Sequence, residues 1–252
     1  QIARMTRQVL GLAMDAGGTM TDTFIVDTDG NFVIGKAPTT PWDESEGFIE
    51  STADAFEQWD LDEKTAFSQF EVSVYAGTTM LNTLLTRTGR QIGLVTSQGF
   101  EDILIMEQGR QVWSGYSHAD RLHSATHVHN EPLVTRRRTR GVSERTDMFG
   151  DVVIPLYEDD ARTVADYLLT QEVEGIAVCF LHSYANPQNE QRMEAILREA
   201  MVDADVDLPI YLSSHIRPVI RENQRVNATT IEAYAADPVR QQLHNVEASA
   251  TK

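Results

Sequence analysis

One octet constrains the fold of this chain more than any other sequence feature. It reads Asp15-Ala16-Gly17-Gly18-Thr19-Met20-Thr21-Asp22. It separates two short runs, residues 9–14 and 23–26, that have the length and apolar content of strands. Two successive glycines permit positive φ and leave backbone N–H groups open to the close approach of an anion. The order strand, Gly-Gly turn, strand therefore predicts a β-hairpin whose turn binds phosphate.

The side chains of the octet suit the same ligand. Thr19 and Thr21 offer hydroxyl donors, while Asp15 and Asp22 have the chemistry to hold hydrated Mg²⁺ or to orient a water molecule. No Gly-Lys-Ser/Thr follows, so the loop is not of the Walker A type, and a strand rather than a helix comes next, which excludes the Rossmann fingerprint. The alternative is an ordinary Gly-Gly hairpin with solvated polar residues; the complete octet favours the phosphate loop.

Beyond the octet, strands and helices alternate along the chain. Asp29-Gly30 predicts the turn of a second hairpin, with residues 32–37 as its return strand. The other expected strands are residues 72–76, 92–96, 139–146, 152–155, 175–181 and 209–213. The expected helices are residues 44–59, 79–87, 100–106, 159–170, 189–202 and 227–244. Residues 107–135 show no clear period and read as a long polar excursion, a kind of segment that is usually functional or binds a partner. The alternation predicts an α/β fold with a largely covered sheet.

Charge excludes several classes of partner. The 252 residues carry a formal net charge of −17, which repels nucleic acid and anionic lipid. The dense basic run Arg136, Arg137, Arg138 and Arg140 is expected to pair with carboxylates. No apolar stretch approaches the roughly 18 residues of a membrane span, and residues 1–7 lack a signal-peptide pattern. A cytoplasmic protein that binds neither nucleic acid nor membrane is expected.

The single cysteine, Cys179, excludes an intramolecular disulfide. It lies in the apolar run 176–181, where a small buried hydrophobe is the default interpretation.

Other positions allow two interpretations each. Gly77-Thr78-Thr79 ends a strand and opens a helix, so it either binds an anion through free N–H groups or caps the helix with a threonine hydroxyl. His182 follows a buried strand and is either an acid–base group or a histidine that satisfies the strand end. Arg221 and Glu222 form either a buried ion pair or a ligand pair.

A histidine cluster lies within the excursion and consists of His118, His123, His127 and His129. His127 and His129 would share one face of a strand, as a metal site requires, and Asp120 and Glu131 would complete it. A polar loop that packs on a partner subunit is the interpretation we favour.

Several motifs together resemble the hydantoinase A/5-oxoprolinase family of the actin–hexokinase–Hsp70 superfamily. They are residues 15–22, Lys36-Ala-Pro-Thr-Thr-Pro41, Gly77-Thr78-Thr79 with Asn82, Val95-Thr-Ser-Gln-Gly-Phe-Glu-Asp102, Gly109-Arg110-Gln111, Leu181-His182-Ser183-Tyr184 with Asn186-Pro187, and Arg221-Glu222 with Thr229-Thr230. They span residues 11–238. The resemblance implies the N-terminal half of a ribonuclease-H-like nucleotide-binding fold, with residues 1–205 as the N-terminal domain and 206–252 as the truncated start of the next domain.

Within the family the resemblance is strongest to subunits of ketone carboxylases. It implies an ATP- and Mg²⁺-dependent ligase that phosphorylates the ketone enol, bicarbonate or both, and joins them into a β-keto acid. The implied partners are a larger alpha-type subunit that carries a further, manganese-type metal, and a small gamma-type subunit. The resemblance implies catalytic roles for Asp15, Asp22 and His182, and nucleotide contacts at Gly17, Gly18, Thr19, Thr21, Gly77, Thr78 and Thr79.

Two other functions stay open at this point. Ring opening of a hydantoin or 5-oxoproline uses the same phosphate chemistry, and a non-catalytic assembly subunit would dock through residues 107–135. No second Gly-Gly-Thr octet follows residue 22, so the chain is expected to be the N-terminal part of a longer protein that holds one half of the ATP site.

Overall fold

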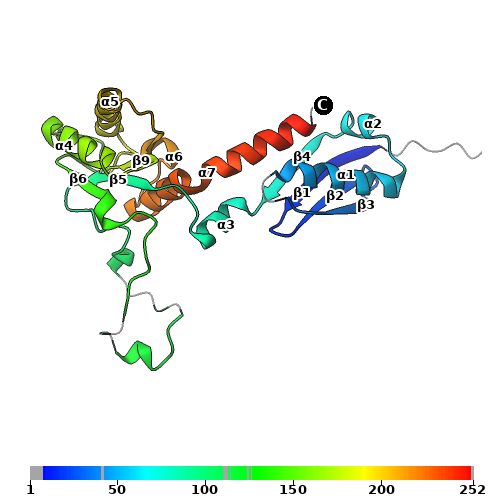
Figure 1. Cartoon of the computed structure of the whole chain (residues 1–252), viewed down its shortest axis with the longest axis horizontal. Coiled ribbons are helices and arrows are strands. Elements are labelled where there is room, and N and C mark those ends of the chain that lie inside the picture. The colour runs from blue at the N-terminus through cyan, green and yellow to red at the C-terminus, as the bar shows by residue number, and fades with distance from the viewer. Residues whose placement is uncertain are drawn as a thin grey trace, which may run out of the picture. The chain divides into compact units, whose positions relative to one another are not determined.

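The structure is a computed structural model that describes residues 8–40, 43–109, 113, 115–123, 125 and 127–250. The chain divides into two compact units, Gln1–Thr88 with Ala236–Lys252, and Gly89–Ala235 (Figure 1). Pro41, Arg110 and Gln111, which belong to sequence motifs described above, lie outside the described residues. Each unit has its own sheet and its own hydrophobic core.

The first unit contains a four-stranded sheet in the order β3-β2-β1-β4. Its elements are β1 (Val9–Ala16), β2 (Met20–Asp27), β3 (Phe32–Pro38), α1 (Glu44–Trp59), α2 (Glu63–Phe67), β4 (Val72–Gly77) and α3 (Thr79–Thr86). β1 pairs antiparallel with β2 and parallel with β4, and β2 pairs antiparallel with β3. The two predicted hairpins are confirmed.

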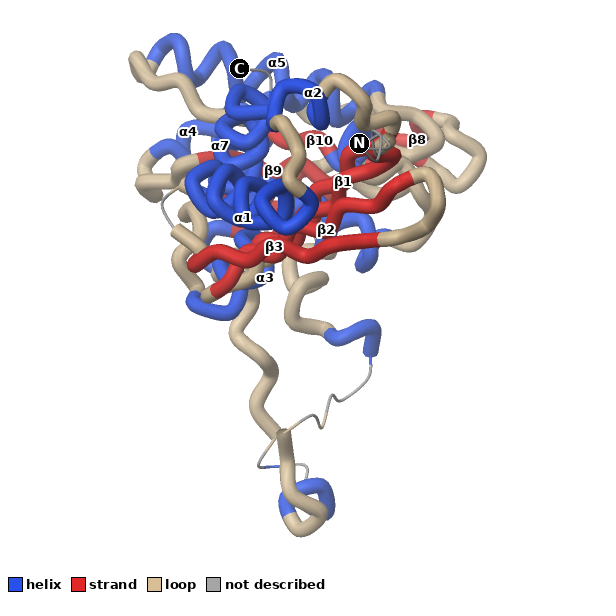
Figure 2. Tube along the Cα trace, turned by 90° about the vertical axis from the view of Figure 1, so that its right-hand side faces the viewer, coloured by secondary structure: helices blue, strands red, loops and turns tan. Residues whose placement is uncertain are grey.

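Helix α1 covers one face of this sheet (Figure 2). Side chains alternate across a strand, so Leu12, Met14, Ile25 and Val33 point toward α1 and are buried with Phe48 and Phe56 of the helix. Asp43 caps α1, because its carboxylate accepts the Ser45 N–H at 3.0 Å. The predicted helix over residues 44–59 is confirmed at both ends.

The opposite face of the sheet is exposed and partly apolar. Phe32, Ile34, Val72 and Val74 are each more than two-fifths exposed. This face also carries Asp15, Asp22 and Lys36 at the end of the strands where the octet lies.

The second unit contains a parallel four-stranded sheet in the order β10-β9-β5-β6 and a small antiparallel pair, β7 and β8. Its strands are β5 (Ile92–Ser97), β6 (Thr139–Val142), β7 (Arg145–Thr146), β8 (Val152–Ile154), β9 (Gly175–Cys179) and β10 (Ile210–Leu212). Its helices are α4 (Glu158–Leu169), α5 (Gln188–Asp203), α6 (Ser213–Ile216) and the first part of α7 (Glu222–Ala250). Both α4 and α5 bury apolar side chains against the sheet, among them Leu168, Met193, Ile196 and Leu197. The predicted α/β class is confirmed.

Two predicted elements are wrong. Residues 100–106 form successive turns instead of a helix, since the N–H groups of Phe100, Ile103 and Ile105 bond carbonyls only three residues back. The Asn223 side chain donates to the Ile103 carbonyl at 3.3 Å, which occupies an acceptor that a helix would use.

The strand predicted over residues 139–146 is two strands, β6 and β7. Asp160 of α4 accepts both the N–H and the hydroxyl of Ser143, the latter at 2.6 Å. This anchor turns the chain away from the parallel sheet at Ser143, after which β7 pairs with β8.

The excursion is confirmed in its described parts. It contains the 3₁₀ turns Glu107–Gly109 and Asp120–Leu122, and its described residues extend away from the parallel sheet of the second unit (Figure 1). Helix α7 is longer than the predicted 227–244, because it begins at Glu222 and continues past an internal Pro238 to Ala250.

Candidate functional site

The octet forms a tight turn between β1 and β2. Asp15 pairs with Asp22 and Ala16 with Thr21, and the Gly17 N–H donates to the Met20 carbonyl at 3.0 Å. Gly18 and Thr19 form the exposed tip. A Cβ at Gly18 would meet no atom closer than the Asn82 amide nitrogen, at 3.6 Å, so the backbone of the tip is open to a ligand.

The second glycine motif lies at the same edge of the sheet. In the parallel pair of β1 and β4, Gly77 is the partner of Ala16. The Thr78 N–H donates to the Ala16 carbonyl at 3.1 Å, and the Thr78 hydroxyl reaches the same carbonyl at 3.3 Å. The Asn82 side chain donates to the Thr78 hydroxyl at 3.3 Å. Two glycine-containing turns far apart in sequence therefore lie side by side.

Helix α3 begins directly after this second turn. Its N-cap residue, Thr78, makes no side-chain capping hydrogen bond, because its hydroxyl is directed to Ala16. Hence the predicted alternative, in which a threonine hydroxyl caps the helix, is not what the structure contains. The first N–H groups of α3 are free of a side-chain cap and suit an anion.

The two aspartates differ in their surroundings. Asp22 forms an ion pair with Lys36, with Oδ1 and Nζ 2.5 Å apart, across the paired strands β2 and β3. Asp15 is exposed on the same sheet face and forms no ion pair or hydrogen bond with any residue the structure describes. Asp15 is thus available for a hydrated cation, whereas Asp22 is held by Lys36.

Thr21 does not line the mouth of the turn. The strand alternation places its side chain toward α1, where it is 0% exposed and its hydroxyl lies 2.9 Å from that of Thr39. The prediction that Thr21 donates beside Thr19 is therefore wrong for the side chain, and Thr21 instead supports the turn from beneath.

The Thr79 side chain also points into the protein and not toward the mouth of the turn. Its hydroxyl donates to Glu44, a buried carboxylate that also accepts the Tyr75 hydroxyl. Burial raises the pKa of Glu44. Only the backbone of Thr79 is left to contact a ligand, and Glu44 links the Gly77-Thr78-Thr79 turn to the start of α1.

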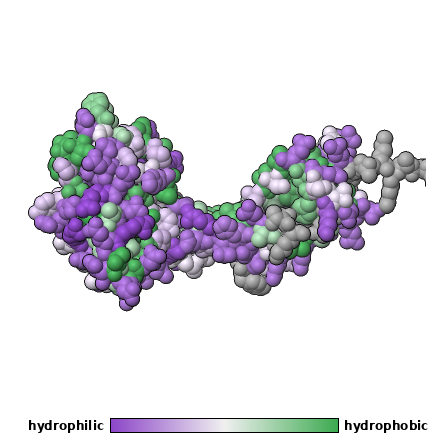
Figure 3. Space-filling view, turned by 90° about the horizontal axis from the view of Figure 1, so that it is seen from above, coloured by the Kyte–Doolittle hydropathy of each residue, from purple (hydrophilic) through white to green (hydrophobic). Residues whose placement is uncertain are grey.

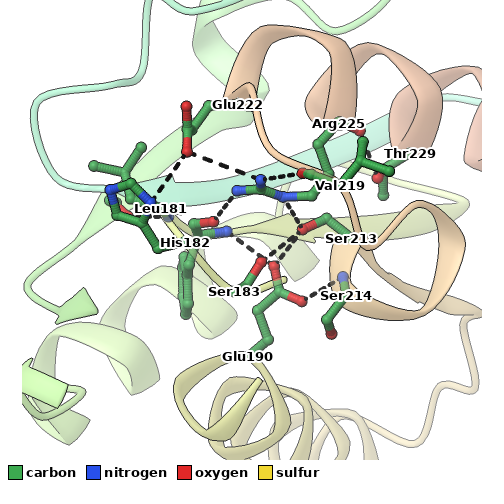
Figure 4. A network of polar contacts seen from close by, with 12 residues as sticks. Leu181, His182, Ser183, Glu190, Ser213, Ser214, Val219, Glu222, Arg225 and Thr229 are labelled. Carbon is green, nitrogen blue, oxygen red and sulfur yellow. Dashed lines mark hydrogen bonds and ion pairs between the residues drawn. The ribbon is translucent and has the colours of Figure 1, made fainter. Parts of the chain in front are cut away.

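His182 lies in the second unit, in the loop after β9 (Figure 4). Its backbone has φ of 55°, a strained conformation for a residue other than glycine. Its Nδ1 is buried without a hydrogen-bond partner and lies 3.6 Å from Oε1 of Glu222. The structure therefore does not support the interpretation in which His182 only forms hydrogen bonds that complete the strand end.

A buried arginine that the sequence did not reveal lies beside it. Arg225 is 0% exposed and donates to the carbonyls of Phe180 and Val219 and to the Ser213 hydroxyl. Arg221, the arginine singled out in the sequence, is exposed, and Glu222 instead approaches Arg225 at 3.9 Å. The signal for Arg225 was its position three residues after Glu222 on one helix face.

Buried Glu190 completes this network. Its carboxylate accepts the Phe180 N–H at 2.9 Å, the Ser213 hydroxyl at 2.6 Å and the Ser214 N–H at 2.9 Å (Figure 4). Cys179 lies next to it and is buried, and burial raises the pKa of its thiol to about 12. The prediction that Cys179 is a small buried hydrophobe is confirmed.

The remaining predicted groups do not form a site. Among the residues that the structure describes, no three His, Cys, Asp or Glu side chains are placed to hold a metal ion. His127 instead stacks within an aromatic group formed with Trp113, Tyr116 and His129.

The arginine run only partly pairs with carboxylates. Arg136 contacts Asp102 at 2.6 Å, but Arg138 donates to Gln91 and Arg140 lies over the Tyr167 ring.

Comparison with known proteins decides the family. The profile of the hydantoinase/oxoprolinase N-terminal region matches residues 11–201, three-quarters of the chain. The chain belongs to the hydantoinase/oxoprolinase family. Its resemblance to that family, first recognised from the motifs, is thereby confirmed.

Relatives within the family include ketone carboxylases. The chain is 45% identical to the acetone carboxylase beta subunit of Xanthobacter autotrophicus over 95% of its own length and 34% of the relative. It is 35% identical to the acetophenone carboxylase gamma subunit of Aromatoleum aromaticum over 88% of its own length and 30% of that protein.

Solved structures show the same similarity. The nucleotide-free structure of acetone carboxylase, an enzyme of ATP-dependent acetone carboxylation, matches with a TM-score of 0.89 and 44% identity over 97% of this chain and 34% of that one. The ATP-dependent caprolactamase of Pseudomonas jessenii matches with a TM-score of 0.77 and 28% identity over 96% of this chain and 33% of that one. The chain spans about a third of the length of the relatives it matches.

None of the helices in the described part of the chain is both long enough and apolar enough to cross a membrane.

Proposed function

We propose that this chain handles nucleotide within an ATP-dependent ketone carboxylase. The observation that carries the proposal is the pair of turns at one sheet edge, Gly17–Thr19 and Gly77–Thr79, held together by the hydrogen bonds between Thr78 and Ala16. The open backbone at Gly18 and the uncapped start of α3 provide N–H donors for phosphate oxygens. The similarity to acetone and acetophenone carboxylase subunits supports a ketone as substrate.

In this proposal both turns contact the phosphates: the N–H groups of Gly18, Thr19 and Thr79 donate to them, while Gly17, Gly77 and Thr78 shape the turns. Asp15 holds Mg²⁺ through water, because a single exposed carboxylate suits a cation that keeps most of its hydration shell. Mg²⁺ neutralises charge on the phosphates when bound. Asp22, oriented by Lys36, positions the attacking oxygen of the substrate, and His182 moves a proton on the ketone.

Further parts of the proposal concern the whole protein. The fold is the N-terminal half of a ribonuclease-H-like nucleotide-binding fold, with a domain boundary between residues 205 and 206. The full-length protein assembles in the cytoplasm with an alpha-type subunit that carries a manganese-type metal and with a small gamma-type subunit. The substrates are ketone, bicarbonate and ATP, and the products are a β-keto acid, inorganic phosphate and the nucleotide left from ATP, ADP or AMP.

A second candidate is ATP-dependent opening of a cyclic amide. The similarity to the caprolactamase structure favours it, and the phosphate turn serves both reactions equally. A third, a non-catalytic assembly subunit that docks through residues 107–135, is the alternative if no nucleotide binds.

Phosphate release from ATP by the full-length protein with its co-purifying subunits tests these candidates. Acetone, acetophenone, hydantoin, 5-oxoproline and caprolactam are each added with and without bicarbonate. Release that needs both a ketone and bicarbonate supports the carboxylase, and release with a cyclic amide alone supports ring opening. No release with any substrate would remove both enzymatic proposals.

Gly18→Val tests the phosphate turn itself. The nearest atom to a new Cβ is 3.6 Å away, so the variant is expected to fold, yet its side chain would stand where phosphate approaches. We expect nucleotide binding, measured by calorimetry on the full-length protein, to fall at least about 100-fold, equivalent to about 2.7 kcal/mol. Gly18→Ala is the graded control, with a smaller loss. Retained binding at an unchanged melting temperature would remove the assignment.

A further inference from the structure

His182 lies where open parallel sheets usually bind ligands. In the second sheet β5 is followed by β6 on one side, and its neighbour β9 is followed by β10 on the other. Ligands of open α/β sheets bind outside the carboxyl ends of strands at such a reversal. Ser97 ends β5, and its hydroxyl accepts the Leu181 N–H at 3.0 Å, so the loop that carries His182 is fastened at this point.

The conformation of His182 is maintained by its neighbours. A positive φ costs free energy in a residue with a side chain, and such strain persists only where the surroundings enforce it. Here Glu190 holds the Phe180 N–H, Ser97 holds the Leu181 N–H, and Arg225 holds the Phe180 carbonyl at 2.6 Å. Buried polar groups thus fix the backbone on the N-terminal side of the histidine.

The His182 ring is only partly buried. Nδ1 is buried without a hydrogen bond, whereas the side chain as a whole is 30% exposed. Glu222 Oε1 is a carboxylate oxygen 3.6 Å from Nδ1, just beyond the length of a hydrogen bond (Figure 4). Hydrogen bonds of reacting groups are often longer than usual before substrate binds.

We propose that Glu222 is a positioning residue for His182: its carboxylate accepts a hydrogen bond from Nδ1–H, which keeps the proton on Nδ1 and leaves Nε2 as the proton acceptor. The nitrogen that carries the proton is set by the hydrogen bond that the other nitrogen makes. This inference rests on the proposed acid–base role of His182 and names the residue that orients it.

Arg225 holds Glu222 in place for this task. Its Nη1 lies 3.9 Å from Glu222 Oε1 and also donates to the Val219 carbonyl, while Nε donates to the Ser213 hydroxyl and Nη2 to the Phe180 carbonyl. The guanidinium stays in the network, and the carboxylate stays available to the histidine. The Tyr184 ring, with its centroid 6.0 Å from that of His182, packs on the same loop.

The test is the tautomer of His182 in the full-length protein, read by solid-state NMR after selective ¹⁵N labelling of histidine. Spectra at pH 9, above the ordinary titration range of imidazole, separate the Nδ1–H from the Nε2–H form. Subtracting the spectrum of His182→Asn identifies the signal. We expect the Nδ1–H form in the wild type and a switch to the Nε2–H form, which free histidine prefers, in Glu222→Ala.

Two further variants sharpen the result. Glu222→Gln keeps an oxygen acceptor and should retain the Nδ1–H form, which a purely structural role would not predict. Glu247→Ala removes the carboxylate of the exposed pair His244–Glu247, with Nδ1 and Oε2 3.9 Å apart, and should leave the His182 signal unchanged. An Nε2–H form in the wild type, or an Nδ1–H form that persists in Glu222→Ala, would overturn the proposal.

The measurement needs neither nucleotide nor ketone, so it is independent of the proposed function. If the tautomer switches in Glu222→Ala while ATP turnover keeps its rate, the link between Glu222 and His182 stands and the acid–base role of His182 fails. If both change, with a fall in kcat larger than any change in KM, both are supported.

Discussion

At the scale of single residues, Glu144 is the group whose burial most clearly makes the stability of the fold depend on pH. It is 3% exposed, and its oxygens accept the Ser97 hydroxyl and, at 2.9 Å, the Asn189 amide. Burial is the main reason that its pKa is raised. A raised carboxyl pKa means that the folded protein binds the proton more tightly than the unfolded chain, so this contribution to stability is complete below the unfolded pKa and is lost as the pH rises through the folded one.

Glu144→Gln removes that dependence. We expect the melting temperature of the variant, relative to wild type, to increase between pH 5 and pH 8, because only the wild type must ionise a buried acid. For a chain of this length 1 kcal/mol corresponds to about 2–4 °C, so an effect of that order is measurable by circular dichroism.

Glu199→Gln is the matched control for this experiment. Glu199 is exposed, and its hydrogen bond with Arg162 holds its pKa below the usual value. Its stability contribution is therefore lost as the pH falls, and any change in the relative melting temperature should have the opposite sign and be small. If the difference in melting temperature between Glu144→Gln and wild type stays constant from pH 5 to pH 8, the raised pKa of Glu144 is contradicted.

At the scale of elements, the contact between α1 and β3 depends on one glycine. An ideal Cβ at Gly35 would lie 1.9 Å from the Ser51 carbonyl oxygen and 2.5 Å from the Ala55 nitrogen. Both are backbone atoms of α1, which cannot move aside as a flexible side chain would. The helix lies close to the sheet because Gly35 has no side chain.

Gly35→Ala is expected to destabilise the protein by about 3 kcal/mol, since overpacking a close backbone contact forces the helix off the sheet. Urea unfolding of the full-length protein measures the loss. Gly11→Ala on β1 is the matched control, because its Cβ would have only ordinary contacts of 3.5 Å and 3.6 Å. Equal stability of the two variants would show that α1 adjusts freely.

At the scale of the whole chain, charge is the dominant property. On the face seen in Figure 3 hydrophilic residues predominate, with smaller hydrophobic patches between them. The net charge of −17 opposes folding through self-repulsion, which salt screens. The exposed ion pairs of Arg162 and Arg192 with Glu158 and Glu199 act in the opposite sense, but such pairs contribute little.

We therefore expect the melting temperature of the 252-residue chain to rise by a few degrees between about 10 and 200 mM salt. Scanning calorimetry in KCl and again in NaCl separates screening from the binding of a particular cation. A melting temperature that falls with added salt in both would mean that ion pairs outweigh the repulsion.

Local sequence patterns were sufficient to predict most of the helices and strands. The Gly-Gly turn, both hairpins, α1, α4 and α5 were predictable because periodicity and turn residues act over a few neighbouring positions. The turn over residues 100–106 and the break at Ser143 were not, since Asn223 and Asp160 cause them from distant parts of the chain.

By itself, the sequence determined the α/β class, the two glycine turns, the buried cysteine and the family, all of which depend on short motifs. Only the tertiary structure decided that Thr21 faces inward, that Lys36 holds Asp22, and that Glu222 and Arg225 meet His182. These facts depend on strand register and on contacts between residues far apart in the chain. Such contacts form when separate elements bury their apolar faces together, and no local pattern records them.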